Sequence, residues 1–262
     1  MRNPFRTRGR SRAALAIMVM IGLWLVCSAH AEETKAGPLK FTDPNAPGYE
    51  DPIENYDPWE GFNRSVYKFN YGFDKYVFLP AVKTYRFLLP EVVRNGISNF
   101  FDNLYEIENV FNNLLQGNAE GTVNSTARIV FNTTLGIAGL LDPATPMGFT
   151  KREEDFGQTL GVWGMGPGPY LVLPLLGPSS VRDGIGTGVD AVVGTVWASF
   201  VVNEIYSNSG DRDKLYWGWT GLYALSTRAG IPFRYYETGS PFEYELVRYI
   251  YLKYRQIQIE EK

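Results

Sequence analysis

The chain has 262 residues and a net charge of −3, with 25 Lys and Arg against 28 Asp and Glu. This length suits one large domain or two small ones, of which we favour one, and the acidic balance gives no sign of the basic face that nucleic acid requires. The single histidine and the single cysteine both lie between residues 22 and 33, so the chemistry of the whole chain depends on whether this segment is retained.

Residues 1–31 are typical of a secretory signal peptide. Five arginines precede the uncharged run Ala13–Val26, and small residues follow in Cys27–Ala31. The run is shorter than the roughly twenty apolar residues that a membrane span needs. No adjacent arginine pair is followed by the usual apolar residues, which indicates general rather than twin-arginine export.

Two processing routes are open for this signal. Lipidation of Cys27 would require a small residue directly before it and usually a leucine three before it, but Val26 and Trp24 occupy those positions. Cleavage after Ala31 fits the small-residue rule better and is favoured. The mature chain would then hold no histidine and no cysteine, which excludes histidine bases, Cys-His nucleophiles, the usual zinc sites and disulfides. We therefore expect no enzyme activity, no metal and no cofactor.

Residues 32–56 are rich in Pro, Gly and acids and are predicted to be a mobile leader. A helix is predicted from residue 57, because Asp57 can cap it, Pro58 suits its first position and Glu60 completes a capping box. Its apolar residues recur at intervals of three and four, which predicts a core-facing stripe. The stripe consists of Trp59, Phe62, Val66, Phe69, Phe73 and Tyr76.

More helices with short joints are predicted over residues 80–132. Pro80 and Pro90 punctuate this region, and one helix is expected from Pro90 to Phe101. Another should follow and end at Gly117 as a left-handed cap. The next helix covers residues 119–132. The side chains expected to be buried on the last two helices are Leu104, Ile107, Phe111, Leu114, Val123, Ala127, Val130 and Phe131.

The character of the chain changes after residue 132. Thr133–Gly148 reads as an apolar loop, and residues 151–155 as a solvated charged turn rather than a pair of glycosidase carboxylates. Phe156–Val181 is 26 residues long and uncharged, but its six Gly and four Pro exclude a regular membrane helix. Irregular backbone cannot face lipid tails, so this segment must pack inside protein or line a wet cavity.

The remainder is predicted to be helical and rich in aromatic residues. Residues 183–203 suit a buried or interfacial helix, and its Gly184-x-Gly186-x-Gly188 pattern indicates tight packing rather than a dinucleotide loop. The cluster at residues 216–223 fits a membrane interface and an aromatic core about equally well. A last helix should begin at Ser240, with Glu243 at the boxing position. Arg182 and Asp183 are interpreted as a structural ion pair.

Three stretches of the chain together resemble the MlaA/VacJ family. They are "DPWEGFNRSVYKFN" from Asp57, "RIVFNTTLGIAGLLDPA" from Arg128 and "DFGQTLGVWGMGPGPYLVLPLLGPSSVRDGIG" from Asp155. The resemblance implies an all-α, ring-shaped domain over residues 57–262, with a central amphipathic channel and a Gly/Pro-rich hairpin segment. Such proteins lie in the periplasmic-side leaflet of the Gram-negative outer membrane and remove misplaced phospholipids from the outer leaflet. The implied partners are phospholipid, a periplasmic lipid carrier and trimeric outer-membrane porins.

The resemblance also implies roles for individual residues. Residues 132–156 would form a hairpin beside the channel, with Gly136 and Gly139 allowing its bends. Asn63, Asn70 and Arg182 are expected to be polar contacts or anchors. The residues expected along the lipid path are Leu135, Gly136, Ile137, Gly139, Leu140, Leu141, Met147, Phe156, Trp163 and Tyr170. Many family members carry a lipidated cysteine, so the poor match around Cys27 is a departure from the pattern.

Two other functions remain open at this point. The chain could be a scaffold that binds porins or other envelope proteins without moving lipid. A secreted phospholipase that uses carboxylates and a metal is disfavoured, because the mature chain would lack histidine. Crosslinking of lipid to residues of the expected path would distinguish a channel from a scaffold. Release of fatty acid from phospholipid by the purified protein would support the phospholipase hypothesis.

Overall fold

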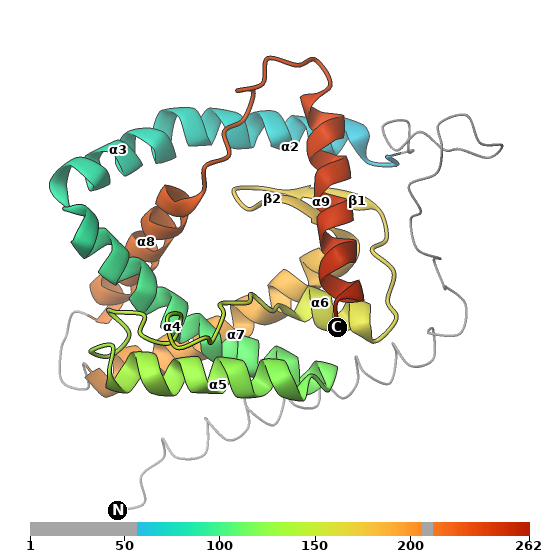
Figure 1. The fold of residues 1–262 in the computed structure, drawn as a ribbon. Coiled ribbons are helices and arrows are strands. Elements are labelled where there is room, and N and C mark those ends of the chain that lie inside the picture. The colour runs from blue at the N-terminus through green and yellow to red at the C-terminus, as the bar shows by residue number, and fades with distance from the viewer. Residues whose placement is uncertain (1–56, 206–211) are drawn as a thin grey trace, which may run out of the picture.

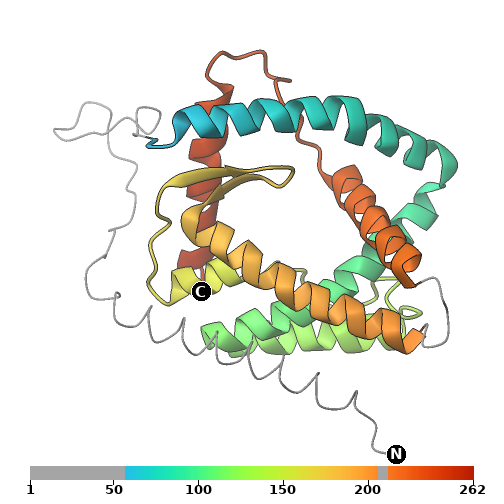
Figure 2. The ribbon, with the colours of Figure 1, turned by 180° about the vertical axis from the view of Figure 1, so that it is seen from behind.

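The computed structural model describes residues 57–205 and 212–262, and these form a ring of helices (Figures 1 and 2). The expected signal peptide, the leader and Cys27 lie outside the described residues. The elements in chain order are α2 (Glu60–Phe73), η2 (Asp74–Phe78), α3 (Leu79–Leu88), α4 (Glu91–Gln116), α5 (Ala119–Thr134), α6 (Phe156–Val162), β1 (Tyr170–Leu173), β2 (Gly177–Ser180), α7 (Val181–Ile205), α8 (Arg212–Gly230) and α9 (Glu243–Glu260).

The helices follow one another around the ring, and this confirms the predicted all-α class. α2, η2 and α3 run along one side, α4 and α5 pack as an antiparallel pair, and α6, α7, α8 and α9 complete the circle (Figure 1). The short β1–β2 hairpin reaches from the side of α6 and α9 into the space between the helices in both views (Figures 1 and 2). None of the helices in the described ranges is both long and apolar enough to cross a membrane.

The prolines and Gly117 define the joints of the first half. Pro80 does not interrupt the α2–η2–α3 rod; the π-helical turn Asp74–Phe78 lies directly before it, where proline removes a backbone donor. Pro90 precedes α4, which continues without a break to Gln116, so the two helices expected after Pro90 are a single helix. Gly117 ends it in the left-handed conformation, with φ of 71°, as predicted.

The predicted core-facing stripe of the first helix is wrong. Phe62 is 56% exposed and Phe69 is 54% exposed, and of the six stripe residues only Val66 is buried. The face of α2 that packs inward carries Asn63, Tyr67 and Asn70 instead. The helix is amphipathic as predicted, but its polar face is the buried one.

The same inversion occurs on α4 and α5. Val123 and Val130, expected on the buried side of α5, are more than half exposed. The buried residues of α5 are Gly121, Ser125, Arg128 and Asn132, and those of α4 are Phe101, Asn103, Glu106, Asn109, Asn112 and Asn113. Helical periodicity identifies an apolar face but not what that face contacts, and here it faces away from the protein interior.

Hydrogen bonds and ion pairs hold the polar interior together. Arg128 Nε lies 2.5 Å from Glu106 Oε1, and both side chains are almost fully buried. Arg128 also donates to the Phe149 carbonyl at 2.7 Å and to Asp142 at 3.3 Å. Such groups are stable in a protein interior only when each finds a partner, so this network fixes how α4, α5 and the 135–149 loop fit together.

The second half contains two small apolar clusters and a tight helix contact. Val66, Tyr67, Tyr170, Val172 and Tyr244 form one cluster, and Phe156 and Leu160 form the other. A Cβ at Gly186 would lie 2.3 Å from the Gly157 amide nitrogen, which confirms close packing at that glycine. It is not the role of the whole pattern, because a Cβ at Gly184 would make only an ordinary contact at 3.6 Å and one at Gly188 would meet nothing within 4 Å. The ion pair of Arg182 with Asp183, at 2.9 Å, is confirmed as structural and buried.

Three predictions about the charged and aromatic segments need correction or refinement. The turn at residues 151–155 is only partly solvated, because Glu154 is buried. α9 begins at Glu243, whose carboxylate does not box the helix but accepts hydrogen bonds from Tyr67 and Thr238 at 2.8 and 2.6 Å. In α8, Trp219 packs on Phe101, which confirms the aromatic-core interpretation for that residue. Trp217 is 71% exposed, and its place at a membrane interface stays a prediction.

Candidate functional site

The β1–β2 hairpin ends in a short apolar tip. β1 pairs antiparallel with β2 from Tyr170 opposite Ser180 to Leu173 opposite Gly177, which leaves three residues in the loop. Leu175 has φ of 68° and Gly177 has φ of 90°, as the tight reversal requires. Leu175 and Leu176 are exposed at the tip, the latter by 69%. The uncharged Gly/Pro segment thus presents apolar side chains within the ring.

Two asparagines of α2 hold β1 in place. Asn63 donates from Nδ2 to the Tyr170 carbonyl at 3.0 Å and accepts from the Val172 amide at 2.8 Å. Asn70, two turns later, donates to the Leu173 carbonyl at 3.0 Å and accepts from the Leu175 amide at 2.7 Å. Both side chains therefore act as partners for the free edge of β1, and both predicted polar anchors are structural contacts of the hairpin.

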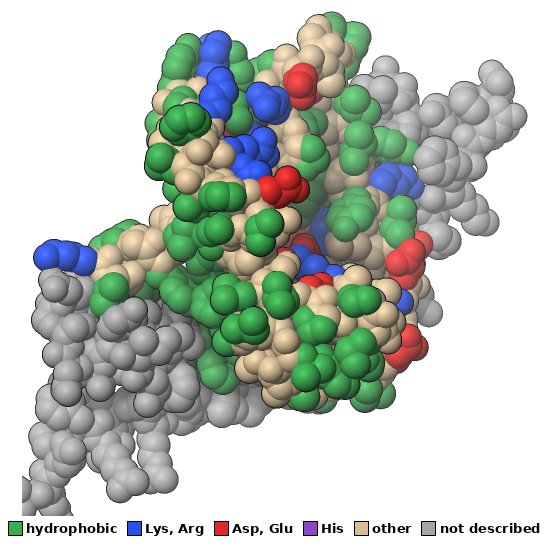
Figure 3. Space-filling model, turned by 60° about the vertical axis from the view of Figure 1, so that its left-hand side comes forward, with side chains coloured by type: hydrophobic (Ala, Val, Ile, Leu, Met, Phe, Trp, Pro, Cys, Tyr) green, Lys and Arg blue, Asp and Glu red, His purple; other side chains and the backbone are tan. Residues whose placement is uncertain are grey.

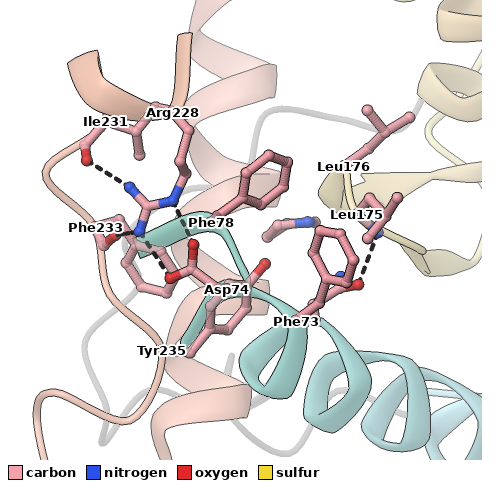
Figure 4. A pocket seen from close by; sticks show the side chains of 11 residues that line it. Phe73, Asp74, Phe78, Leu175, Leu176, Arg228, Ile231, Phe233 and Tyr235 are labelled. Carbon is pink, nitrogen blue, oxygen red and sulfur yellow. Dashed lines mark hydrogen bonds and ion pairs between the residues drawn. The ribbon is translucent and has the colours of Figure 1, made fainter. Parts of the chain in front are cut away.

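A cavity of about 190 Å³ lies between the hairpin tip, the η2 turn and the segment after α8 (Figure 4). In the view of Figure 4, the rings of Phe73 and Phe78 lie between the leucines of the tip and a charged pair on the far side. The wall consists of Asn70, Phe73, Asp74, Phe78, Leu175, Leu176, Pro178, Arg228, Ile231, Phe233 and Tyr235. It is mainly apolar, with a few polar groups at one end.

The polar end of the cavity is built on Asp74 and Arg228. Arg228 Nε and Nη2 lie 2.6 and 2.8 Å from the two Asp74 oxygens, a bidentate geometry. The hydrogen bond to Asp74 raises the pKa of Arg228, so the guanidinium keeps its charge. Arg228 also donates to the Ile231 and Phe233 carbonyls at 2.9 and 3.1 Å, which anchors the segment after α8.

The lining of this cavity suits the binding of an amphipathic molecule better than the catalysis of a reaction. The phenylalanines and leucines offer apolar surface for an alkyl chain, and the neutralised Asp74–Arg228 pair gives the opposite wall a polar character. Within residues 57–205 and 212–262, no group of three or more His, Cys, Asp or Glu side chains is placed to hold a metal ion.

Most residues expected along the lipid path lie away from this cavity. Leu135, Ile137, Leu140, Leu141 and Met147 are exposed on the loop that packs against α4 and α5. Asn99 donates to the Leu140 carbonyl at 3.2 Å, and Gly139 approaches Asn103 closely. Gly136 is buried, and a Cβ there would lie 2.4 Å from the Asn132 carbonyl oxygen.

The remaining expected path residues are parts of the scaffold. Phe156 is fully buried beneath Trp163, whose Nε1 donates to the Leu115 carbonyl at 3.0 Å. Tyr170 is buried against Tyr244, and Arg182 serves the ion pair with Asp183. Among the expected site residues that fall within the described part of the chain, Asn70 alone lines the cavity described above.

The cavity residues that sequence reasoning missed come from three separate stretches, residues 73–78, 175–178 and 228–235. Leu175 and Leu176 had a readable signal, since they are adjacent leucines between Pro174 and Gly177 in the uncharged segment. Arg228 and Phe233 had none, because nothing in their local sequence indicates that they meet η2 across the ring.

A family model described as MlaA lipoprotein matches residues 55–258. The uncharacterized protein RP093 of Rickettsia prowazekii is 40% identical over 131 residues, which is 50% of this chain and 52% of that protein. The intermembrane phospholipid transport system lipoprotein MlaA of Escherichia coli K12 is 41% identical over 139 residues, which is 51% of this chain and 55% of that protein. The match thus spans about half the length of these curated relatives.

A solved structure is similar over most of the chain. It is described as the structural basis for maintenance of bacterial outer membrane lipid asymmetry, and its TM-score to this chain is 0.57 at 30% identity. The similarity covers 78% of this chain and 99% of the other. The likeness therefore concerns the ring as a whole rather than one helical pair.

Proposed function

The chain belongs to the MlaA lipoprotein family, and from that premise we propose that it is a phospholipid-translocation channel of the Gram-negative outer membrane. It lies in the periplasmic-side leaflet, removes misplaced phospholipids from the outer leaflet and passes them to a periplasmic carrier. The lipid is transported without chemical change, so the protein needs no catalytic group and no cofactor.

The single observation that carries this proposal is the inverted distribution of side chains. Asn63, Glu106, Asn112 and Arg128 are almost fully buried, whereas large apolar side chains cover the outside of α2, α4 and α5. Figure 3 shows one side of the ring, on which many hydrophobic side chains are exposed among polar ones. In water this arrangement would be costly, but beside lipid tails the exposed apolar faces need no protein cover.

The lipid route passes the hairpin tip. An acyl chain contacts Leu175, Leu176, Phe73 and Phe78, while the headgroup keeps to the polar end of the opening, because a charged headgroup stranded among apolar groups would cost several kcal/mol. The irregular hairpin backbone is protected from hydrocarbon by Asn63 and Asn70.

Deleting the gene and complementing it with variants tests the proposal. Leu175→Asp/Leu176→Asp places two charges in the route and should fail to lower outer-leaflet phospholipid, measured with a membrane-impermeant amine-reactive reagent. Leu140→Asp/Leu141→Asp is the matched control on the exposed 135–149 loop and should complement. If deletion leaves outer-leaflet phospholipid unchanged, the transport function is wrong. If only the loop variant fails, the route follows the loop and not the hairpin.

A photocrosslinker at Leu176 separates transport from a scaffold role. A channel should yield phospholipid adducts at this position, whereas a scaffold that only binds porins should yield none. Crosslinkers on the outer surface of the ring test the proposed protein partners, a trimeric porin and the periplasmic carrier. Absence of both proteins from the adducts would remove these partners from the proposal.

A further inference from the structure

The corner between α3 and α4 combines apolar and basic side chains at the surface. Phe87 is 87% exposed and Val92 is 80% exposed, and the residue that follows each of them, Leu88 and Val93, is also exposed. Lys83 and Arg94 lie within one or two helical turns of these residues. We refer to Lys83, Phe87, Leu88, Val92, Val93 and Arg94 as the basic corner.

The sequence around this corner is basic, although the chain as a whole is acidic. Residues 75–94 carry four Lys and Arg and one acid, Glu91, although acids outnumber bases over the whole chain. Within the described residues, no carboxylate forms an ion pair with Lys83, Arg86 or Arg94. Figure 3, in which this side of the ring comes forward, shows Lys and Arg side chains beside hydrophobic ones in the upper part of the molecule, with some Asp or Glu side chains near them.

The corner is held in position by the helices around it. Arg86 donates from Nη2 to the Ala229 carbonyl at 2.6 Å, which ties the end of α3 to the end of α8. Val82 and Tyr85 are buried beneath the surface, and Pro90 sets the angle between α3 and α4. The exposed side chains are thus presented together on a rigid bend rather than on a loose loop.

We propose that the basic corner docks on the anionic headgroup layer of a phospholipid bilayer. Phe87, Leu88 and Val92 enter the region between headgroups and acyl chains, and Lys83 and Arg94 contact lipid phosphates. Apolar side chains flanked by cations are the combination that binds anionic membrane surfaces, since burial of the apolar groups and attraction of the charges act together. The excess of basic over acidic residues at this corner of an acidic chain favours this occupant over a neutral lipid surface.

The proposal concerns which lipid surface the ring prefers and where it touches that surface. It is independent of translocation, because docking needs neither the hairpin nor the cavity. A failure of docking and a failure of transport are therefore distinguishable, the first by vesicle binding and the second by outer-leaflet phospholipid.

Vesicle flotation with the purified full chain tests the proposal. Vesicles of phosphatidylcholine with and without phosphatidylglycerol are compared for the parent, for Lys83→Gln/Arg94→Gln and for Arg152→Gln/Arg234→Gln, a control pair of exposed cations outside the corner and outside α2, α4 and α5. Each cation near an anionic surface contributes about fivefold, so the preference for phosphatidylglycerol should fall by up to about thirtyfold in the first variant only. An equal fall in the two variants, or in neither, would overturn the proposal.

A fluorophore that reports polarity tests insertion directly. Attached at Phe87→Cys in a Cys27→Ser background, it should shift to shorter wavelength with phosphatidylglycerol vesicles, whereas the same label at Arg152→Cys, an exposed position outside α2, α4 and α5, should shift less. If the Phe87 label responds only to lipopolysaccharide, or only to an acidic protein partner, the occupant is not a phospholipid surface and the assignment is wrong.

Discussion

Asn63 and Asn70 provide, through their side-chain amides, the hydrogen bonds that a neighbouring strand would otherwise provide through its backbone. Asn63 both donates to and accepts from β1, and it also donates to Asp57 at 3.2 Å. Asn70 donates to the last residue of β1 and accepts from Leu175 in the loop that follows. Their spacing of seven residues places them on one face of α2, two turns apart. The burial of these amides is thus explained by the free edge of the hairpin.

Asn63→Ala should lower the free energy of unfolding by about 2–4 kcal/mol. The substitution leaves the Tyr170 carbonyl and the Val172 amide without partners in a buried place, at a cost of about 1–3 kcal/mol each. Denaturant unfolding in detergent measures the change, with Asn95→Ala at an exposed position as the control. Equal stability of the two variants would show that the hydrogen bonds of the Asn63 side chain to β1 do not stabilise the fold.

Gly139 and Gly148 form a matched pair for testing the 135–149 loop. Both have positive φ, of 90° and 98°, but a Cβ at Gly139 would meet Asn103 Cβ at 2.8 Å, whereas one at Gly148 would meet nothing within 4 Å. Gly148→Ala should cost about 1–2 kcal/mol for the left-handed backbone alone. Gly139→Ala should cost at least about 1 kcal/mol more, since Asn103 must move and lose its bond to Thr133. Thermal unfolding compares them, and equal losses would argue against the close approach.

At the scale of elements, the contact between α4 and α7 contains two neighbouring acidic side chains, Glu108 and Asp190, whose ionisation destabilises it. Burial, followed by the neighbouring charge of Asp190, raises the pKa of Glu108 to about 7. Burial and the charge of Asp155 raise the pKa of Asp190 to about 6, although the Phe156 amide donates to its carboxylate at 3.0 Å. Both groups thus resist ionisation in the folded protein.

The free energy of unfolding should therefore fall as pH rises. A raised folded-state pKa contributes stability that is fully present below the unfolded value, about 4 for a carboxylic acid, and is lost as pH rises through about 7. Glu108→Gln should be more stable than the parent by about 2 kcal/mol at pH 8 and should show a shallower pH dependence. Denaturation series across this range measure both, with Glu120→Gln as an exposed control. A parent whose stability rises with pH in this window would contradict the assignment.

At the scale of the whole molecule, the outer surface of the ring should hold the protein at the membrane. The exposed aromatic and aliphatic side chains of α2, α4 and α5 form a wide apolar rim, and burial of this rim among lipid tails would hold the protein without a lipid on Cys27. Cys27→Ala should therefore leave the protein in the membrane fraction after alkaline washing.

Mass spectrometry of the mature protein completes this test. An amino terminus at Glu32 would agree with cleavage after Ala31, and a lipidated Cys27 would contradict it. Release of Cys27→Ala into the soluble fraction would show that the lipid, and not the rim, provides attachment.

The sequence by itself determined the helical class, several of the joints and the family. Periodicities of three and four, Pro90, Gly117 and the close-packed glycines act through local geometry, and so they could be read without the fold. The tertiary structure alone decided which face of each helix is buried, which residues Asn63 and Asn70 bind, and that Arg228 meets Asp74 across 154 positions of the chain. The reason is physical: amphipathicity sets two faces apart, but the medium outside and the partners across the ring determine which face turns inward.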